Sequence, residues 1–204
     1  MSQPNEAVGR KIDDAMHEGR RRDLATAALQ TWSEHGYAQV SVRNVARRTR
    51  FSHGMVHYYF HSKDALVGEC VKLICEAQIF SACDVVATDI TSYSQQVAES
   101  ISESFRVNRR FHRIRFDLLN QSLFEPSLRP HAADLDRVYA ACRERLHQSY
   151  VALGWEFDPP FELLAQHIDA LVARAVRDEI LHGDLPSTTA RLREELHHIL
   201  PKDS

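Results

Sequence analysis

The amino-acid sequence predicts an all-α protein with a small N-terminal unit of three helices and a larger helical C-terminal part. Apolar residues recur at intervals of three and four along most of the 204 residues, and no convincing strand pattern interrupts them. Serine, glycine and proline residues fall where these periodic segments begin and end. An apolar content of 44% supports a packed core, which excludes disorder of the whole chain.

The predicted helices divide the chain into three parts. Residues 1–19 carry no apolar period, and we expect a flexible arm there. Residues 20–66 form a three-helix domain, in which the first helix ends at Gly36. A longer helix begins at Ser62, and residues 67–204 form a second helical domain with further helices near residues 92–107, 111–123, 130–153, 161–182 and 187–200.

Two very short helices follow Gly36. Ser41 and Ser52 each stand where a serine can cap a helix, and Val45 and Val56 mark the inward faces of the two segments. Helices of about two turns bury little surface, so we expect them to be displayed for a partner. The outward side of the second helix is expected to carry His53, Gly54, Met55, His57, Tyr58 and Tyr59.

The charge of this region indicates the kind of partner. Residues 20–63 contain eight Lys or Arg and only two Asp or Glu, in a chain whose net charge is −3. A basic segment on an acidic protein favours a polyanion such as double-stranded DNA, because each neutralised phosphate releases counterions. We expect His53, Gly54 and Met55 near base edges, with phosphates or groove walls contacted by Ser41, Arg43, Ser52, His57, Tyr58, Tyr59 and Lys63. The alternative is a solvated basic face with aromatic residues in the core.

The same residues resemble a known family. Residues 22–66 are similar to the N-terminal domain of the tetracycline-repressor (TetR) family of bacterial regulators. The matching motifs are Trp32-Ser33-Glu34-His35-Gly36-Tyr37, Ser-Val-Arg-x-x-Ala from Ser41, and Ser52-x-Gly54 leading to Tyr59-Phe60-x-x-Lys63-x-x-Leu66, over roughly a quarter of the chain. The resemblance implies a helix-turn-helix, a homodimer and a C-terminal pocket for a small-molecule effector, in a repressor that leaves a palindromic operator when the effector binds.

The sequence also departs from the family pattern. Arg50 replaces the usual glycine of the turn, and Phe51 replaces the small aliphatic residue after it. A common tyrosine of the second short helix is His57, so the base preference of the family cannot be transferred. These departures keep an alternative open, a helical small-molecule carrier or protein-interaction module that has lost DNA binding.

The C-terminal part offers candidates for a pocket and for a dimer interface. The last two helices present apolar stripes that suit either core packing or a partner, and the resemblance implies a four-helix interface formed by Leu164, Ile168, Leu171, Val172, Ala175, Leu192 and Leu196. Aromatic residues that could line a pocket are Phe80, Phe105, Phe116, Tyr139 and Trp155. A weaker similarity to the choline-sensing BetI branch suggests a quaternary ammonium effector held by aromatic rings.

Other classes of function lack support in the sequence. No segment has the apolar length of a membrane span, and we expect a cytoplasmic protein with reduced cysteines. There is no phosphate-binding glycine loop or nucleophile elbow, so we expect no enzyme activity, no catalytic residues and no cofactor. No histidine pair combines His-x-x-x-His spacing with a nearby carboxylate, so we predict no metal site.

Overall fold

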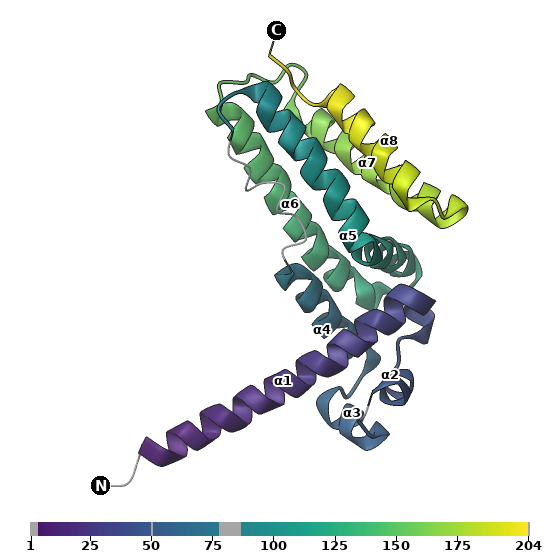
Figure 1. Ribbon diagram of the computed structural model, residues 1–204. Helices are drawn as coiled ribbons and strands as arrows, with labels where there is room; N and C mark the ends of the chain where they lie inside the picture. The colour runs from purple at the N-terminus through teal and green to yellow at the C-terminus, as the bar shows by residue number, and fades with distance from the viewer. Residues whose placement is uncertain (1–3, 50, 78–86, 204) are drawn as a thin grey trace. The chain divides into compact units, whose positions relative to one another are not determined.

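The computed structural model describes residues 4–49, 51–77 and 87–203, with side chains from residue 15 onward. Every regular element in these ranges is helical, as expected (Figure 1). Two residues named above, Arg50 and Phe80, lie outside the described residues. The α-helices are α1 (Pro4–His35), α2 (Val42–Arg48), α3 (His53–Tyr59), α4 (Lys63–Glu76), α5 (Ile90–Phe124), α6 (Arg129–Ala152), α7 (Phe161–His182) and α8 (Leu185–Ile199), with 3-10 turns η1 (Tyr37–Gln39) and η3 (Pro126–Leu128).

The chain forms two compact units, and the expected boundary after Leu66 is not where they divide. Unit 1 consists of Met1–Ala77 and Ile114–Asp134, and unit 2 consists of Gln78–Arg113 and Leu135–Ser204. Helix α4 and the C-terminal third of α5 therefore belong with the three-helix domain. The sequence could not indicate this, because Asp117 of α5 accepts hydrogen bonds from Trp32 of α1 and Tyr37 of η1, residues about 80 positions away.

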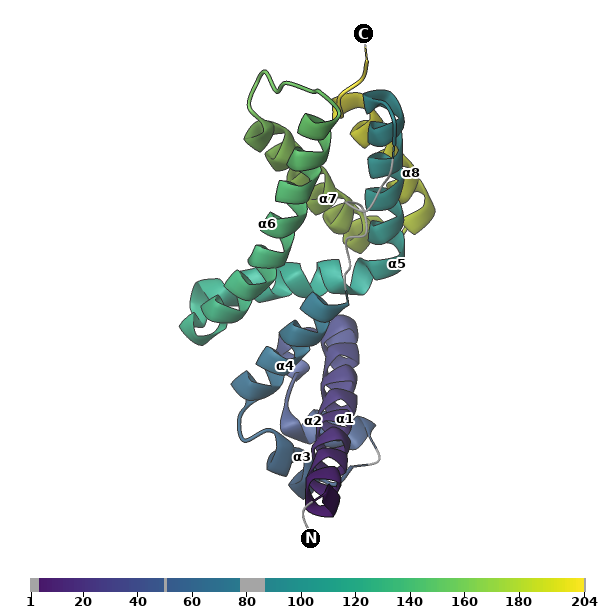
Figure 2. The ribbon, with the colours of Figure 1, turned by 90° about the vertical axis from the view of Figure 1, so that its left-hand side faces the viewer.

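Helix α1 differs from the expected flexible arm. It begins at Pro4, so the segment without an apolar period is the first half of one long helix rather than a separate arm (Figure 1). A helix needs no apolar stripe to continue once it is nucleated, and seven of the sixteen residues from Pro4 to Gly19 are good helix formers. In unit 1, α1 packs along α4, and α2 and α3 lie beside it (Figure 2).

Unit 2 is built from the N-terminal two thirds of α5, most of α6, and the pair α7 and α8, which pack side by side (Figure 1). The break predicted between the helices near residues 92–107 and 111–123 is confirmed, because non-helical backbone at Asn108 kinks α5 and separates two helical segments. Gly183 adopts φ 70°, a left-handed conformation that favours glycine, and it ends α7 before the turn into α8. Among the described residues, no helix has the length and apolar character that a membrane span requires.

Candidate nucleic-acid interface

The two short helices of unit 1 begin where the sequence predicted. The Ser41 hydroxyl accepts a hydrogen bond from the backbone N–H of Asn44 at 3.2 Å, and the Ser52 hydroxyl accepts one from Met55 at the same distance. Each serine satisfies an N–H group that the first turn of a helix leaves unpaired. Both hydroxyl oxygens accept capping bonds, so a contact of either serine with a phosphate would use its O–H group as donor.

Helix α3 presents one buried side and one exposed side. Val56 is completely buried, whereas Met55 and Tyr58 have exposed fractions of 39% and 66%. His53, Gly54 and His57 share the exposed side. The prediction for Tyr59 is wrong, because its exposed fraction is only 7% and its ring packs on His17 with centroids 4.6 Å apart.

The outward side chains of α3 have few partners inside the chain. His53, His57 and Tyr58 make no side-chain hydrogen bond or ion pair with any described residue, and their contacts are ring contacts with neighbouring aromatic side chains. Gly54 lies in the middle of this face, and a Cβ atom built on it would meet nothing within 4 Å. A helical glycine costs about 0.5–1 kcal/mol relative to alanine, and the fold gives no steric reason for it.

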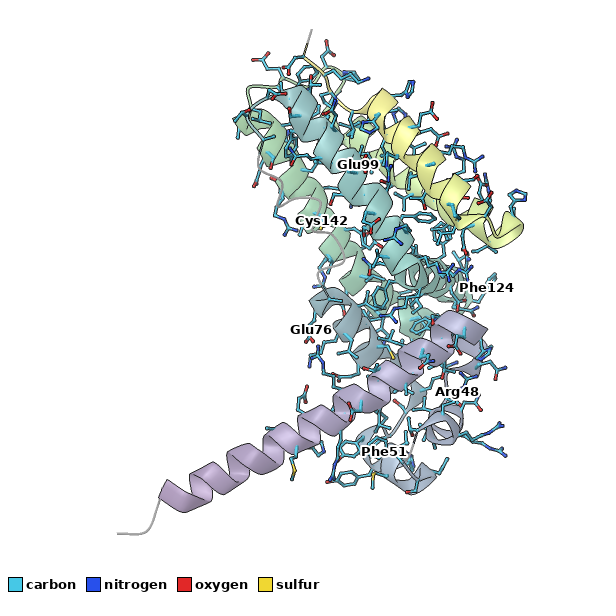
Figure 3. All side chains as sticks on the ribbon, in the orientation of Figure 1. Arg48, Phe51, Glu76, Glu99, Phe124 and Cys142 are labelled. Carbon is cyan, nitrogen blue, oxygen red and sulfur yellow. The ribbon has the colours of Figure 1, made fainter. Side chains whose placement is uncertain are left out.

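Helix α2 adds positive charge beside α3. Arg43 and Arg47 are exposed, and Figure 3 shows Arg48 on the same helix. Arg48 is held within the chain, because it pairs with Glu34 at 2.9 Å and contacts His35. Hydrogen bonds from Gln30 and Arg48 lower the pKa of the Glu34 carboxyl below its ordinary value. Arg43 and Arg47 are thus the α2 cations available to a phosphate.

Lys63 does not lie as predicted. Its ammonium group stands 3.3 Å from the centroid of the Tyr37 ring, in a cation–π contact. Burial lowers the pKa of Lys63, although the carboxylates of Glu125 and Asp117 partly oppose this effect. Lys63 therefore supports the interior of unit 1, and its proposed role at a phosphate would require the side chain to leave Tyr37.

A carboxylate that the sequence analysis did not single out holds the start of the helix-turn-helix. Asp117 of α5 accepts hydrogen bonds from the indole N–H of Trp32 at 2.8 Å and from the backbone N–H of Tyr37 at 2.6 Å. The Tyr37 hydroxyl in turn donates to Glu125 at 2.9 Å. The signal in the sequence was indirect: a buried Trp needs an acceptor for its N–H, but nothing local identifies which one.

The basic run Arg20-Arg21-Arg22 lies within α1 and is partly structural. Arg21 donates to Glu69 of α4 at 2.8 Å and to the backbone carbonyl of Tyr59 at 3.1 Å, and its guanidinium lies over the Phe60 ring. Burial alone would raise the pKa of Glu69, but its hydrogen bonds to Arg21 and Lys72 bring the pKa below the ordinary value. Arg21 therefore ties α1 to α4 and to the end of α3.

Unit 2 contains a separate apolar cavity of about 60 Å³. Of the proposed pocket aromatics that the structure describes, only Tyr139 lines it. Phe105 is buried elsewhere on α5, Trp155 is half-buried after α6, and Phe116 belongs to unit 1. The cavity is lined by Val97, Ile101, Tyr139, Cys142, Arg143, Leu146, Ala165, Ile168, Asp169 and Val172.

The residues proposed for the dimer interface differ in how exposed they are in the structure. Ala175, Leu192 and Leu196 are buried within the single chain, the last two with exposed fractions of 1% and 0%, so they cannot be surface contacts. Ile168 and Val172 face the cavity. Leu164 and Leu171 remain half-exposed. The most exposed apolar residues of α7, which the prediction missed, are Leu163, Ile180 and Leu181.

Comparison with known proteins places this geometry in context. Residues 24–70 match the family model described as bacterial regulatory proteins, tetR family. The chain is 25% identical over 167 residues to the HTH-type transcriptional repressor Rv3405c of Mycobacterium tuberculosis. This alignment covers 77% of this chain and 85% of that protein. It is 38% identical over 53 residues to the HTH-type transcriptional regulator BetI of Agrobacterium fabrum, 26% of each protein.

A solved structure extends the similarity to the fold of the whole chain. A Saccharomonospora viridis protein, crystallised in complex with choline, superposes with a TM-score of 0.68 at 20% sequence identity. The superposition covers 89% of this chain and 95% of that one. At this identity the similarity concerns the fold.

Proposed function

Because this chain is a member of the TetR family of bacterial transcriptional regulators, which are DNA-binding proteins rather than enzymes, we propose that it is a repressor released from its operator by a small molecule. The repressor binds a palindromic operator as a homodimer. Two copies of α3, about 34 Å apart, read successive turns on one side of the duplex.

The observation that carries this proposal is the outward side of α3. It combines a glycine in open space with imidazole and phenol groups that have no hydrogen-bonding partner among the described residues. Polar side chains that are exposed on a rigid short helix and left unpaired can contact base edges and phosphates without first breaking an internal bond. A glycine at the same place lets the helix backbone approach the bases closely.

Two substitutions, each compared with the wild-type protein, test whether the outward side of α3 reads DNA bases. His53→Ala is expected to cost about 1–3 kcal/mol of binding free energy on the operator, and much less on random duplex, because it removes a base contact. Arg43→Ala is expected to weaken binding to both duplexes similarly and to reduce the salt slope by about one ion. Fluorescence anisotropy across a series of salt concentrations measures both quantities. Equal losses on operator and random duplex for His53→Ala would remove its base-reading role.

The homodimer forms through the exposed side of α7. Leu163, Ile180 and Leu181 have exposed fractions of 44%, 55% and 65%, and Leu164 and Leu171 are half-exposed on the same helix. Apolar side chains gathered on one helix suit a second copy of the chain, because a two-fold interface uses the same surface on both partners. The proposal replaces the buried residues of the original prediction with exposed ones.

Sedimentation of matched variants tests this interface. Leu181→Glu is expected to shift the protein from dimer to monomer at micromolar concentration, because it places charge in the interface. Leu123→Glu is the control, since Leu123 has a similar exposed fraction of 68% but lies on α5 in unit 1. Dimers of unchanged stability in Leu181→Glu would place the interface elsewhere.

The effector enters the apolar cavity of unit 2. Its walls are mainly aliphatic, and Tyr139 and the ion pair of Arg143 with Asp169, 3.0 Å apart, supply polar groups. At about 60 Å³ the cavity is smaller than the roughly 300–1,000 Å³ typical of drug-sized ligands, so the effector is small or widens the cavity on binding. The choline bound to the S. viridis protein supports a small organic cation, which Asp169 and the Tyr139 ring could hold.

Calorimetry tests this proposal. Choline is expected to bind the wild-type protein and to bind Asp169→Asn at least about tenfold more weakly, because a charged partner is lost. Choline should also reduce operator affinity, since a ligand shifts an equilibrium only through different affinities for the two states. Binding that is equally strong in both proteins would argue against this site.

A further inference from the structure

The outward side of α3 carries two histidines whose spacing has a second chemical use. His53 and His57 are four residues apart, so their side chains lie on the same side of the helix, one turn from each other. The ring centroids are 6.4 Å apart, and both side chains are exposed. His-x-x-x-His on a helix is the spacing with which two imidazoles bind one zinc ion.

Although the sequence analysis predicted no metal site, we propose that His53 and His57 form a binding site for a divalent transition-metal ion that prefers imidazole, such as Zn²⁺, and that this ion competes with DNA for the two side chains. The competition with DNA rests on the proposed function, whereas the metal site itself does not.

The two histidine rings are close enough to bind one ion after a small change of side-chain conformation. Two imidazole nitrogens that each lie about 2.0–2.1 Å from one ion bring their ring centroids to roughly 5 Å, so the observed separation must close by about 1 Å. Exposed side chains change rotamer readily, and neither ring is held by a hydrogen bond or ion pair to the described part of the chain. Rotation about the side-chain torsions can therefore close the gap without moving the backbone.

The composition of the site determines which ion it takes and how firmly. Imidazole nitrogen suits zinc, copper and nickel, whereas magnesium and calcium prefer oxygen ligands. Among the described residues, no third His, Cys, Asp or Glu joins a cluster that could surround an ion. Two protein ligands leave the remaining positions to water, so the ion is held less firmly than in a four-ligand structural site and exchanges with solution. An exchangeable ion suits sensing rather than structural support.

The position of the pair explains the competition. His53 is expected to contact a base edge, and His57 a phosphate or groove wall. An ion bound between them occupies the ring nitrogens that would donate or accept these hydrogen bonds, and its water ligands stand between the helix and the groove. His61, whose ring is 6.2 Å from that of His57, lies beyond the end of α3, where the helix no longer fixes the spacing.

Titration of the full-length protein with ZnCl₂, followed by calorimetry and by the histidine proton resonances, tests the site. One ion per chain is expected for the wild-type protein. His53→Gln and His57→Gln should each weaken binding by at least the roughly 10–100-fold that loss of a second-shell partner costs a metal site. His182→Gln, which removes an exposed histidine at the end of α7, should bind as the wild type does. MgCl₂ should give no site.

The outcomes separate the two parts of the proposal. Unchanged zinc binding in His53→Gln, or a loss confined to His61→Gln, would overturn the assignment of the pair. Operator affinity should fall as ZnCl₂ is added to the wild type and stay constant for His57→Gln. An operator affinity that does not change with zinc concentration in either protein would overturn the proposed competition. If the protein bound zinc through this pair but bound no DNA, the proposed function would fail while the metal site stood.

Discussion

Helices α3 and α7 differ in whether their polar side chains pair with residues of other helices. On α7, Asp169, Arg174, Asp178 and Glu179 all pair with charged residues of other helices, and Glu179 is nearly buried. On α3, the histidines and Tyr58 have no such partner among the residues described. Charges that are paired inside the chain hold a fold together, whereas unpaired polar groups on a fixed helix are available to another molecule. Substitutions should therefore reduce stability in one case and binding in the other.

The largest loss of stability is expected from replacing Asp117, which accepts the hydrogen bonds that join α5 to the segment before the helix-turn-helix. Asp117→Ala leaves the N–H groups of Trp32 and Tyr37 without their acceptor, and should lower the free energy of unfolding by about 2–4 kcal/mol. Urea denaturation measures this loss. Asp117→Asn keeps one side-chain oxygen and should lose less; if the two variants were equally stable, Asp117 would not be the anchor described here.

The next largest loss of stability is expected from breaking an ion pair of α7. Arg113→Ala removes the closest partner of Glu179, 2.6 Å away, and leaves a carboxylate with 5% exposure beside Arg109 at 3.5 Å. We expect a loss of about 1–3 kcal/mol, below the full cost of breaking a buried pair because Arg113 is itself 39% exposed. Arg106→Ala, which breaks an exposed pair with Glu103, is the matched control and should leave the stability nearly unchanged. Equal denaturation midpoints for the two variants would contradict the distinction.

A smaller change in stability should accompany a loss of binding on α3. Gly54→Ala is expected to stabilise the protein by about 0.5–1 kcal/mol, because the added methyl group meets nothing and alanine favours the helix. The same methyl group should weaken operator binding by about tenfold or more if the backbone approaches the bases. Gly19→Ala is the control: it also lies in a helix with open space, and it should stabilise α1 without changing operator affinity. Unchanged DNA binding in Gly54→Ala would mean that this face is not used.

The sequence predicted what is decided locally. Ser41 and Ser52 cap their helices through residues three positions away, and the faces of α3 follow from the period of a helix, so caps, exposure and most of the helix bounds could be predicted. Gly183 and Asn108 likewise mark an end and a break in helices where the pattern of apolar residues weakened.

The errors concern residues whose environment is set by distant parts of the chain. Lys63 turns toward Tyr37, whose hydroxyl is bonded to Glu125, 88 positions away. Tyr59 is covered by His17 of a helix that the sequence pattern did not extend so far. Leu192 and Leu196 look the same in sequence whether a partner or the chain itself covers them. Such choices depend on tertiary packing, which a single sequence does not encode in any short segment.

The most direct test of the central claim is selection of bound sequences from a pool of random DNA duplexes by the wild-type protein. The account predicts enrichment of one two-fold symmetric sequence with half-sites about one helical turn apart, and loss of that enrichment when His53 and Gly54 are replaced together. No enriched sequence, combined with no retardation of any duplex at low ionic strength, would contradict it.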